Sequence, residues 1–198
     1  MPWHMQVFDE DEDSKSYLKE GQDLERLLED PFQKVFHHGH AVPPEHQPFR
    51  FVQRTDKADY PDLFQGRFFG DMIMSARMRA VIEGLAPASA GLQFVPVVIE
   101  RSDGRPGPEG CSFFKAFDLV DAIVSERSEV APQYHGGRFY RYDAWIGAKL
   151  AFRPEVVGGR HIWVDKYLTN RVFISDEMRA AMMAAGLTGV STSRVDPD

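Results

Sequence analysis

The chain has one cysteine, Cys111, among 198 residues, so an internal disulfide is excluded. Its first residues, Met1 to Met5, lack the basic region and apolar stretch of a secretory signal peptide. No uncharged apolar run approaches the roughly 20 residues that a membrane helix needs. These absences predict a soluble cytoplasmic protein with no membrane partner, in which Cys111 is a buried thiol.

Motifs of the common enzyme classes are missing too. The sequence has no G-x-S-x-G elbow, no P-loop, no G-x-G-x-x-G after a strand and no H-E-x-x-H pair. Cys111 has no evident histidine partner. We therefore expect a protein that is not an enzyme and needs no cofactor.

Basic residues are in the minority, at 23 against 30 acidic ones, for a formal net charge of −7. Nucleic-acid binding needs a concentrated positive surface, so this balance argues against a nucleic-acid partner. Part of the excess lies in one acidic run, Asp9, Glu10, Asp11, Glu12 and Asp13. Such a run is typical of a solvated loop, although it can also steer a basic protein partner toward the adjoining surface.

The composition indicates an α+β protein. Hydrophobic residues make up 43% of the chain, and 13 prolines and 16 glycines are spread along it, as expected for many short elements joined by turns. Proline-rich sequence between residues 37 and 61 marks a boundary. We expect an N-terminal subregion, 1–60, with a strand at 3–8, an acidic loop and a helix through Leu24 and Leu28, followed by an α+β domain at 61–198.

One pattern occurs twice, about a hundred residues apart. Residues 74–80 (MSARMRA) and 174–180 (ISDEMRA) each follow an extended apolar run, and each leads through a glycine to another β-rich run. Ser75 and Ser175 are placed to cap helices, and apolar residues follow at helical spacing. The sequence therefore predicts a duplicated strand-helix-strand unit, with short amphipathic helices against mixed or mainly antiparallel sheets.

Turn signals predict further strands. Residues 102–110 carry Asp-Gly and Pro-Gly steps between two apolar runs, which indicates an antiparallel pair formed by 95–101 and 112–118. A second turn is expected at His135-Gly136-Gly137. The runs 49–52, 144–152 and 160–164 are predicted to be extended.

The only constellation of possible metal ligands is a histidine cluster, His37, His38, His40 and His46. An H-x-H spacing in a strand points two imidazoles to one side, and a third histidine completes an open zinc-type site. This leaves open an alternative function as a metal-dependent hydrolase or metal-binding module. The proline-rich surroundings instead favour a surface loop.

Six further segments are informative together: residues 68–75, 91–97, 117–123, 125–130, 172–178 and 185–189. They resemble a family of bacterial polymorphic-toxin immunity proteins, the eleventh class of the immunity-protein series. The resemblance extends from near Asp62 to Val195 and leaves the N-terminal part outside. It implies a protein made beside a secreted toxin that binds this toxin one to one and blocks it, with no catalytic residues.

A surface for such a partner is suggested by the aromatic and arginine residues between 134 and 145. Tyrosine, tryptophan and arginine are favoured anchors in protein interfaces. The alternative is that half of these rings lie in the core. The predicted contact residues, besides the acidic run, are Tyr134, Arg138, Tyr140, Tyr142 and Trp145. The oligomeric state is not predicted.

Overall fold

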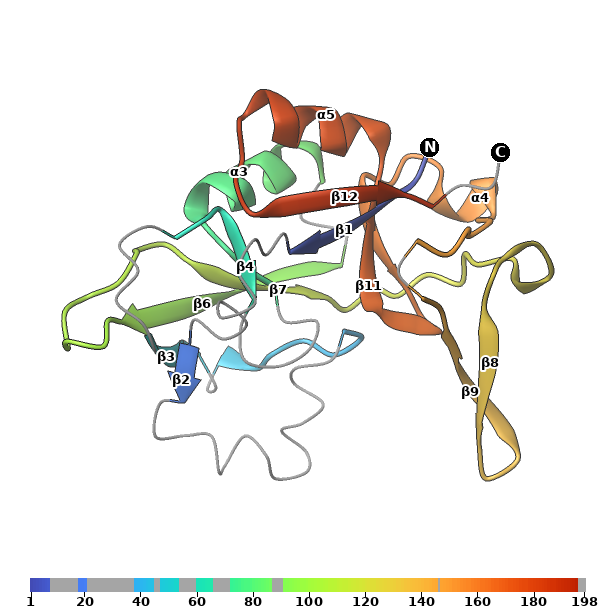
Figure 1. Ribbon diagram of the computed structural model, residues 1–198, viewed down its shortest axis with the longest axis horizontal. Coiled ribbons are helices and arrows are strands. Elements are labelled where there is room, and N and C mark those ends of the chain that lie inside the picture. The colour runs from blue at the N-terminus through green and yellow to red at the C-terminus, as the bar shows by residue number, and fades with distance from the viewer. Residues whose placement is uncertain are drawn as a thin grey trace.

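The computed structural model describes residues 1–7, 18–20, 38–44, 47–53, 60–65, 72–86, 91–145 and 147–195 (Figure 1). Strands outnumber helices within them, and the predicted α+β class is confirmed. The predicted helix through Leu24 and Leu28 falls outside the described residues. The elements in chain order are β1 (Trp3–Val7), β2 (Leu18–Glu20), β3 (Phe49–Gln53), β4 (Leu63–Gln65), β5 (Met72–Met74), α3 (Ala76–Leu85), β6 (Leu92–Glu100), β7 (Ser112–Ala116), η4 (Ser125–Arg127), β8 (Ala131–His135), β9 (Arg138–Asp143), α4 (Pro154–Val157), β10 (Ile162–Asp165), β11 (Leu168–Ile174), α5 (Asp176–Ala184) and β12 (Val190–Arg194).

Two sheets form the body of the molecule. The larger has the strand order β2-β3-β6-β7-β5-β4 and is mixed, because β3 runs parallel to β6 while the other neighbours are antiparallel. The smaller has the order β10-β11-β1-β12 and is antiparallel throughout. The predicted hairpin from β6 to β7 is confirmed.

The duplicated unit is visible in the strand order. β5 and β6 lie on either side of β7, and α3 connects them. In the same way β11 and β12 lie on either side of β1, and α5 connects them. A further antiparallel strand flanks each unit, β4 beside β5 and β10 beside β11. The central strand of the first unit follows it in the chain, whereas that of the second comes from the N-terminus.

The helices of the two units begin in the same way. The Oγ atom of Ser75 accepts a hydrogen bond from the Met78 amide at 3.1 Å, and that of Ser175 accepts one from the Met178 amide at 3.2 Å. Each bond satisfies an amide that the first helical turn leaves without a partner. Both predicted caps are confirmed.

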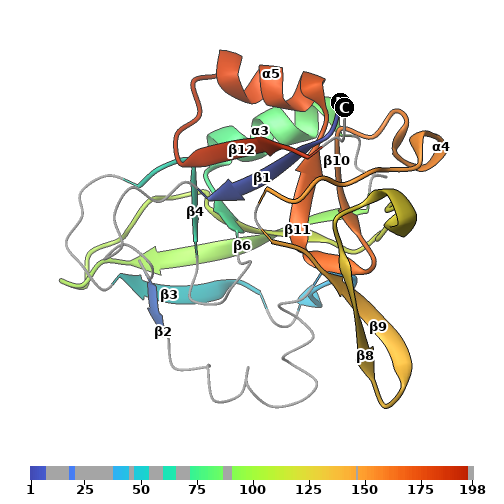
Figure 2. The same ribbon diagram turned by 45° about the vertical axis from the view of Figure 1, so that its right-hand side comes forward.

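α3 and α5 lie side by side above the sheets (Figures 1 and 2). The Arg77 guanidinium donates to the carbonyls of Ala185 and Gly186 at the end of α5, so the two helices run in opposite directions. Beneath them one apolar cluster combines residues of both units, including Met78, Met178 and Met182. The two units therefore share a core.

Strand residues alternate between this shared core and two outer clusters. Met72 and Met74 face the helices, whereas Ile73 packs with Phe113 on the opposite face of the larger sheet. Trp163 and Phe173 lie on the corresponding face of the smaller sheet. Each sheet thus contributes buried residues to an apolar cluster on both of its faces.

Two equivalent glycines precede the strands that follow the helices. Gly91 stands before β6 with φ +67°, and Gly189 stands before β12 with φ +75°. A Cβ atom would lie 2.0 Å from the Asp118 Cβ in the first case and 2.1 Å from the Leu63 carbonyl oxygen in the second. Positive φ and close approach together require glycine at both positions.

The predicted strand at residues 144–152 is wrong. Among the described residues of this range, only Phe152 forms a bridge, an isolated one to Ile123. The predicted division at residue 60 does not separate the sheets, since β1 pairs with β11 and β12 and β3 pairs with β6.

None of the described helices is long and apolar enough to cross a bilayer.

Candidate protein-binding surface

Residues 131–143 form a hairpin that leaves the body of the molecule. β8 and β9 make up a two-stranded sheet of their own, and His135 pairs with Arg138 so that Gly136 and Gly137 form a two-residue turn. The hairpin points away from both large sheets in two views (Figures 1 and 2). We call it the arm.

The chain on either side of the arm is anchored. Val120, Ala122 and Ile123 before it, and Ala148 and Leu150 after it, are buried in the outer cluster of the smaller sheet. The Ser128 hydroxyl joins the two flanks, donating to the Val124 carbonyl at 2.7 Å and accepting from the Ala151 amide at 2.9 Å. The arm is therefore a projecting hairpin between two segments that are fixed to the core.

Aromatic rings hold the arm against the body of the molecule. Phe139 and Tyr142 lie with their ring centroids 4.9 Å apart, and Tyr167, in the turn from β10 to β11, lies 4.9 Å from Phe139 and 5.8 Å from Tyr142. The Tyr142 amide also donates to the Tyr167 carbonyl at 2.7 Å. The arm thus has a defined orientation before any partner binds.

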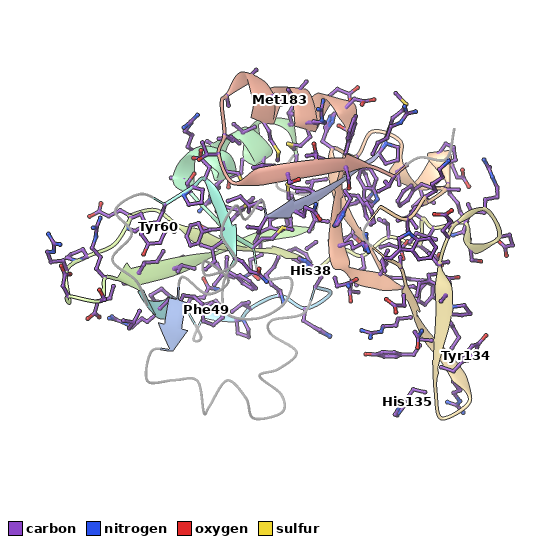
Figure 3. The ribbon with its side chains drawn as sticks, viewed as in Figure 1. His38, Phe49, Tyr60, Tyr134, His135 and Met183 are labelled. Carbon is purple, nitrogen blue, oxygen red and sulfur yellow. The ribbon has the colours of Figure 1, made fainter. Side chains whose placement is uncertain are left out.

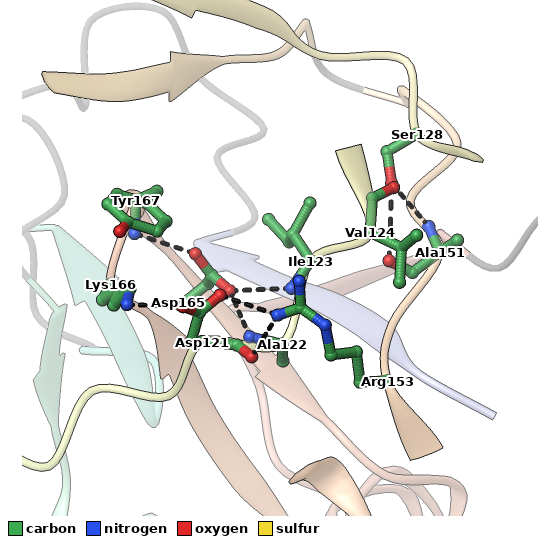
Figure 4. A network of polar contacts seen from close by, with 10 residues as sticks. All are labelled: Asp121, Ala122, Ile123, Val124, Ser128, Ala151, Arg153, Asp165, Lys166 and Tyr167. Atoms are coloured by element: carbon green, nitrogen blue, oxygen red, sulfur yellow. Dashed lines mark hydrogen bonds and ion pairs between the residues drawn. The ribbon is translucent and has the colours of Figure 1, made fainter. Parts of the chain in front are cut away.

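The turn that carries Tyr167 is held by a buried carboxylate (Figure 4). Asp165 is fully buried and accepts hydrogen bonds from the amides of Ala122, Ile123 and Tyr167 at 2.8–3.0 Å. These bonds link the turn to the flank that precedes the arm. Buried carboxylates need such partners, because their desolvation is costly.

An exposed ion-pair network surrounds Asp165. Asp121 accepts from Lys166 at 2.5 Å and from Arg153 at 2.8 Å. The Lys166 and Arg153 contacts hold the pKa of Asp121 below its usual value, and Asp121 in turn raises the pKa values of both bases. This network gives the arm base a fixed charge distribution but presents no arrangement typical of catalysis.

Most of the predicted contact residues are exposed. The exposed fraction is 65% for Tyr134, 64% for Tyr140 and 60% for Trp145. Figure 3 shows Tyr134 and His135 on the arm, far from Met183 of α5. Arg138 is exposed as well, whereas Tyr142 is half-buried at the arm base. Four of the five thus lie on the surface, and Tyr142 belongs to the support of the arm.

The described histidines of the predicted cluster do not form a metal site. His37 and His46 fall outside the described residues. The Nδ1 atom of His38 accepts a hydrogen bond from the Ala116 amide at 2.9 Å, and its ring packs on Phe114. His40 is exposed. Across the described ranges no three His, Cys, Asp or Glu residues come together in a way that could hold a metal ion.

The remaining predicted residues are the acidic run and Cys111. The acidic run from Asp9 to Asp13 lies outside the described residues. Cys111 is buried, as predicted, and burial raises the pKa of its thiol to about 11, which keeps it protonated and unreactive.

Sequence reasoning missed Tyr167 and Asp165, which hold the arm in place. Both lie in the turn from β10 to β11, and nothing near them in the sequence marks them as partners of the arm. Their role arises from contacts between segments that are distant in the chain, so no local sequence pattern predicts it.

The sequence matches the profile of the immunity protein family (Imm11) over residues 4–196. The match begins close to the N-terminus, so the expectation that the N-terminal part lies outside the resemblance is wrong. No curated protein matches the chain.

Proposed function

The chain belongs to the immunity protein family Imm11, and we propose that it binds and neutralises a cognate secreted bacterial toxin by a stoichiometric protein–protein contact, without catalysis or a cofactor. The family match is the observation that carries this proposal. We further propose that the contact forms in the cytoplasm of the producing cell, and that neither nucleic acid nor membrane takes part.

The arm is the surface that we assign to the toxin. Its exposed tyrosines and arginines are of the residue types that dominate binding energy in protein interfaces. Its base is held by rings and by the Asp165 hydrogen bonds, so little conformational entropy is lost on binding. In this proposal Tyr134, Arg138, Tyr140 and Trp145 touch the toxin, and Tyr142 positions them.

The net charge supports a toxin with a basic surface. A chain of charge −7 attracts a cationic partner at long range and raises the association rate. The acidic run from Asp9 to Asp13 adds to this attraction in our proposal.

Co-expression tests the proposal. The product of the gene adjacent to this chain is induced with and without the chain, growth is followed, and the complex is isolated by pull-down. We expect toxicity without the chain, rescue with it, and a complex of fixed stoichiometry. A toxic neighbour that is neither bound nor neutralised contradicts the proposed pairing.

The assignment of the arm and of the adjoining Trp145 is tested by a double variant, Tyr140→Ala with Trp145→Ala. We expect it to weaken the complex at least about 30-fold, because exposed aromatic anchors carry much of an interface's energy. Met183→Ala is the matched control, since Met183 is 63% exposed but lies on α5, away from the arm. Equal effects of both variants would remove the arm from the interface.

A further inference from the structure

The charge of the arm is opposite to that of the whole molecule. It contains Arg138 and Arg141 and one acidic residue, Asp143, at the end of β9 furthest from the turn, although the chain carries −7 overall. Both arginines are exposed. Within the described residues neither forms an ion pair, and Arg141 contacts only the Tyr140 ring, with 5.9 Å between the guanidinium and the ring centroid.

Several surface arginines elsewhere are paired with a carboxylate, whereas the exposed Arg50 and Arg127 form no ion pair within the described residues. Arg79 pairs with Glu83, Arg105 with Asp103, and Arg153 with Asp121. The arm thus presents two guanidinium groups without ion pairs on a projecting element, Arg138 next to the turn and Arg141 opposite Gln133. A guanidinium group offers paired N–H donors that match a carboxylate, and it is less strongly hydrated than an ammonium group.

The shape of the arm limits how a partner can cover it. Every residue from 131 to 141 is exposed, although the Phe139 ring, at 37% exposure, also packs against Tyr167 of the body. Both faces of the two-stranded sheet are therefore accessible near its turn. A flat partner surface covers only one face of such an element, whereas a cleft covers both. Deep clefts lined by one sign of charge also strengthen the field on an inserted ion.

From these observations we infer that the arm inserts into an acidic cleft of the toxin, where carboxylates pair with Arg138 and Arg141. This inference rests on the proposed function and adds the chemistry of the partner's binding site to it. The two electrostatic features then act at different ranges. The negative net charge attracts the basic exterior of the toxin, and the positive arm pairs with acidic groups inside its cleft.

The net charge and the arm arginines should affect different rate constants of toxin binding. Charges far from the contact mainly alter the association rate, while desolvated ion pairs mainly alter the dissociation rate. Loss of the arm arginines should therefore shorten the lifetime of the complex more than it slows its formation.

The test uses two double variants with the same change in net charge. Arg138→Glu with Arg141→Glu alters the arm, and Arg50→Glu with Arg127→Glu alters exposed arginines on β3 and η4. The probe is a catalytically inactive form of the toxic neighbour's product, immobilised and measured for association and dissociation rates at two salt concentrations. Thermal unfolding checks that all variants fold.

We expect the arm variant to dissociate at least about 100-fold faster, and the control variant to change dissociation less than about 3-fold. Replacing cleft carboxylates of the toxin by lysine should restore binding to the arm variant and not to the control. Equal dissociation rates of the two variants, with tight binding by the unaltered chain, would overturn the acidic-cleft inference and leave the proposed function standing. No binding by the unaltered chain would defeat both.

Arginine and aromatic residues also suit single-stranded nucleic acid, which is the competing occupant. The net charge of −7 disfavours it. A labelled single-stranded DNA and a labelled RNA oligonucleotide are titrated with the same proteins. Affinity in the micromolar range or tighter that is lost in the arm variant would assign the arm to nucleic acid and overturn the inference.

Discussion

His4 is an ionisable residue buried in the middle of the smaller sheet. It is 6% exposed and lies in β1 between Phe173 of β11 and Ser193 of β12. Burial, and then the positive charge of Arg171, lower its pKa from 6.5 to about 4. The folded protein therefore holds His4 neutral at pH values where the unfolded chain protonates it.

This shift predicts an acid-sensitive stability. Because the unfolded chain binds the additional proton between pH 6.5 and 4, the free energy of unfolding should fall by up to about 3 kcal/mol as the pH decreases through that range. Above pH 6.5 the contribution is fully present. Urea unfolding at a series of pH values measures it.

The matched variants are His4→Gln, which removes the buried imidazole, and His40→Gln, which removes an exposed one. We expect His4→Gln to flatten the slope between pH 6.5 and 4, whatever its stability at pH 7, and His40→Gln to retain it. An unchanged slope in the His4 variant would show that other groups cause the acid sensitivity.

Gly189 allows a prediction about the cost of adding a single Cβ atom. Gly189 and Gly159 have nearly equal φ angles, +75° and +76°, but only Gly189 has atoms within 4 Å of an added Cβ. Gly159→Ala should therefore cost about 1 kcal/mol from backbone strain alone. Gly189→Ala should cost at least about twice as much, because the Leu63 carbonyl must also move. Chemical denaturation of both variants gives the difference, and equal costs would refute the steric argument.

At the scale of elements, the arm depends on a ring that belongs to another hairpin. Tyr167 contacts Phe139 and Tyr142 of the arm from the turn between β10 and β11. This turn is itself fixed by the Asp165 carboxylate. The orientation of the arm is therefore a property of the contact between two hairpins.

Tyr167→Ala should loosen the arm without unfolding the sheets. We expect amide hydrogen exchange in β8 and β9 to accelerate at least about tenfold, while β11 and β1 stay protected, and we expect a loss of about 1–3 kcal/mol in the free energy of unfolding. Tyr134→Ala is the control, because the Tyr134 ring is exposed and meets only Phe139 among the described rings. Unaltered exchange in β8 and β9 of the Tyr167 variant would show that the rings do not hold the arm.

The elements also show where local patterns succeed and fail. The helices at Ser75 and Ser175 were predicted because a cap and an amphipathic period are local properties. Residues 144–152 form a mainly apolar run of the length of a strand, and Ala148 and Leu150 are indeed buried. Their backbone bonds go instead to a serine hydroxyl and to single carbonyls, such as that of Val195, so no ladder forms. An apolar run predicts burial, but a strand also needs a neighbouring strand to pair with.

At the scale of the whole molecule, the first strand is central rather than terminal. β1 lies between β11 and β12 and contributes Met5 to the core shared by both units. The Asp62 carboxylate joins the units as well, accepting from Ser75 of the first and from the Thr188 amide of the second. Neither unit has a complete core alone.

Deletion of residues 1–7 should therefore disrupt the fold, although short terminal deletions are often tolerated. We expect loss of the cooperative thermal transition and reduced β-sheet circular dichroism, because β11 and β12 lose their shared partner. A synthetic peptide of residues 1–7, added in excess, should restore the transition at least in part. A truncated chain that unfolds cooperatively at the original temperature would contradict this role of β1.

The sequence by itself determined the features that depend on neighbouring residues. These are the α+β class, the repeated cap and helix, the β6–β7 and β8–β9 turns, and the burial of Cys111, since caps, turns and apolar periods act over a few residues. Tertiary structure alone decided that β1 completes the second unit, that His4 is buried and that Tyr167 supports the arm. It also decided that residues 131–141 project from the body and are exposed. Each of these depends on which distant segments come into contact. Such contacts cost conformational entropy, and only the close packing of the whole core compensates for this cost.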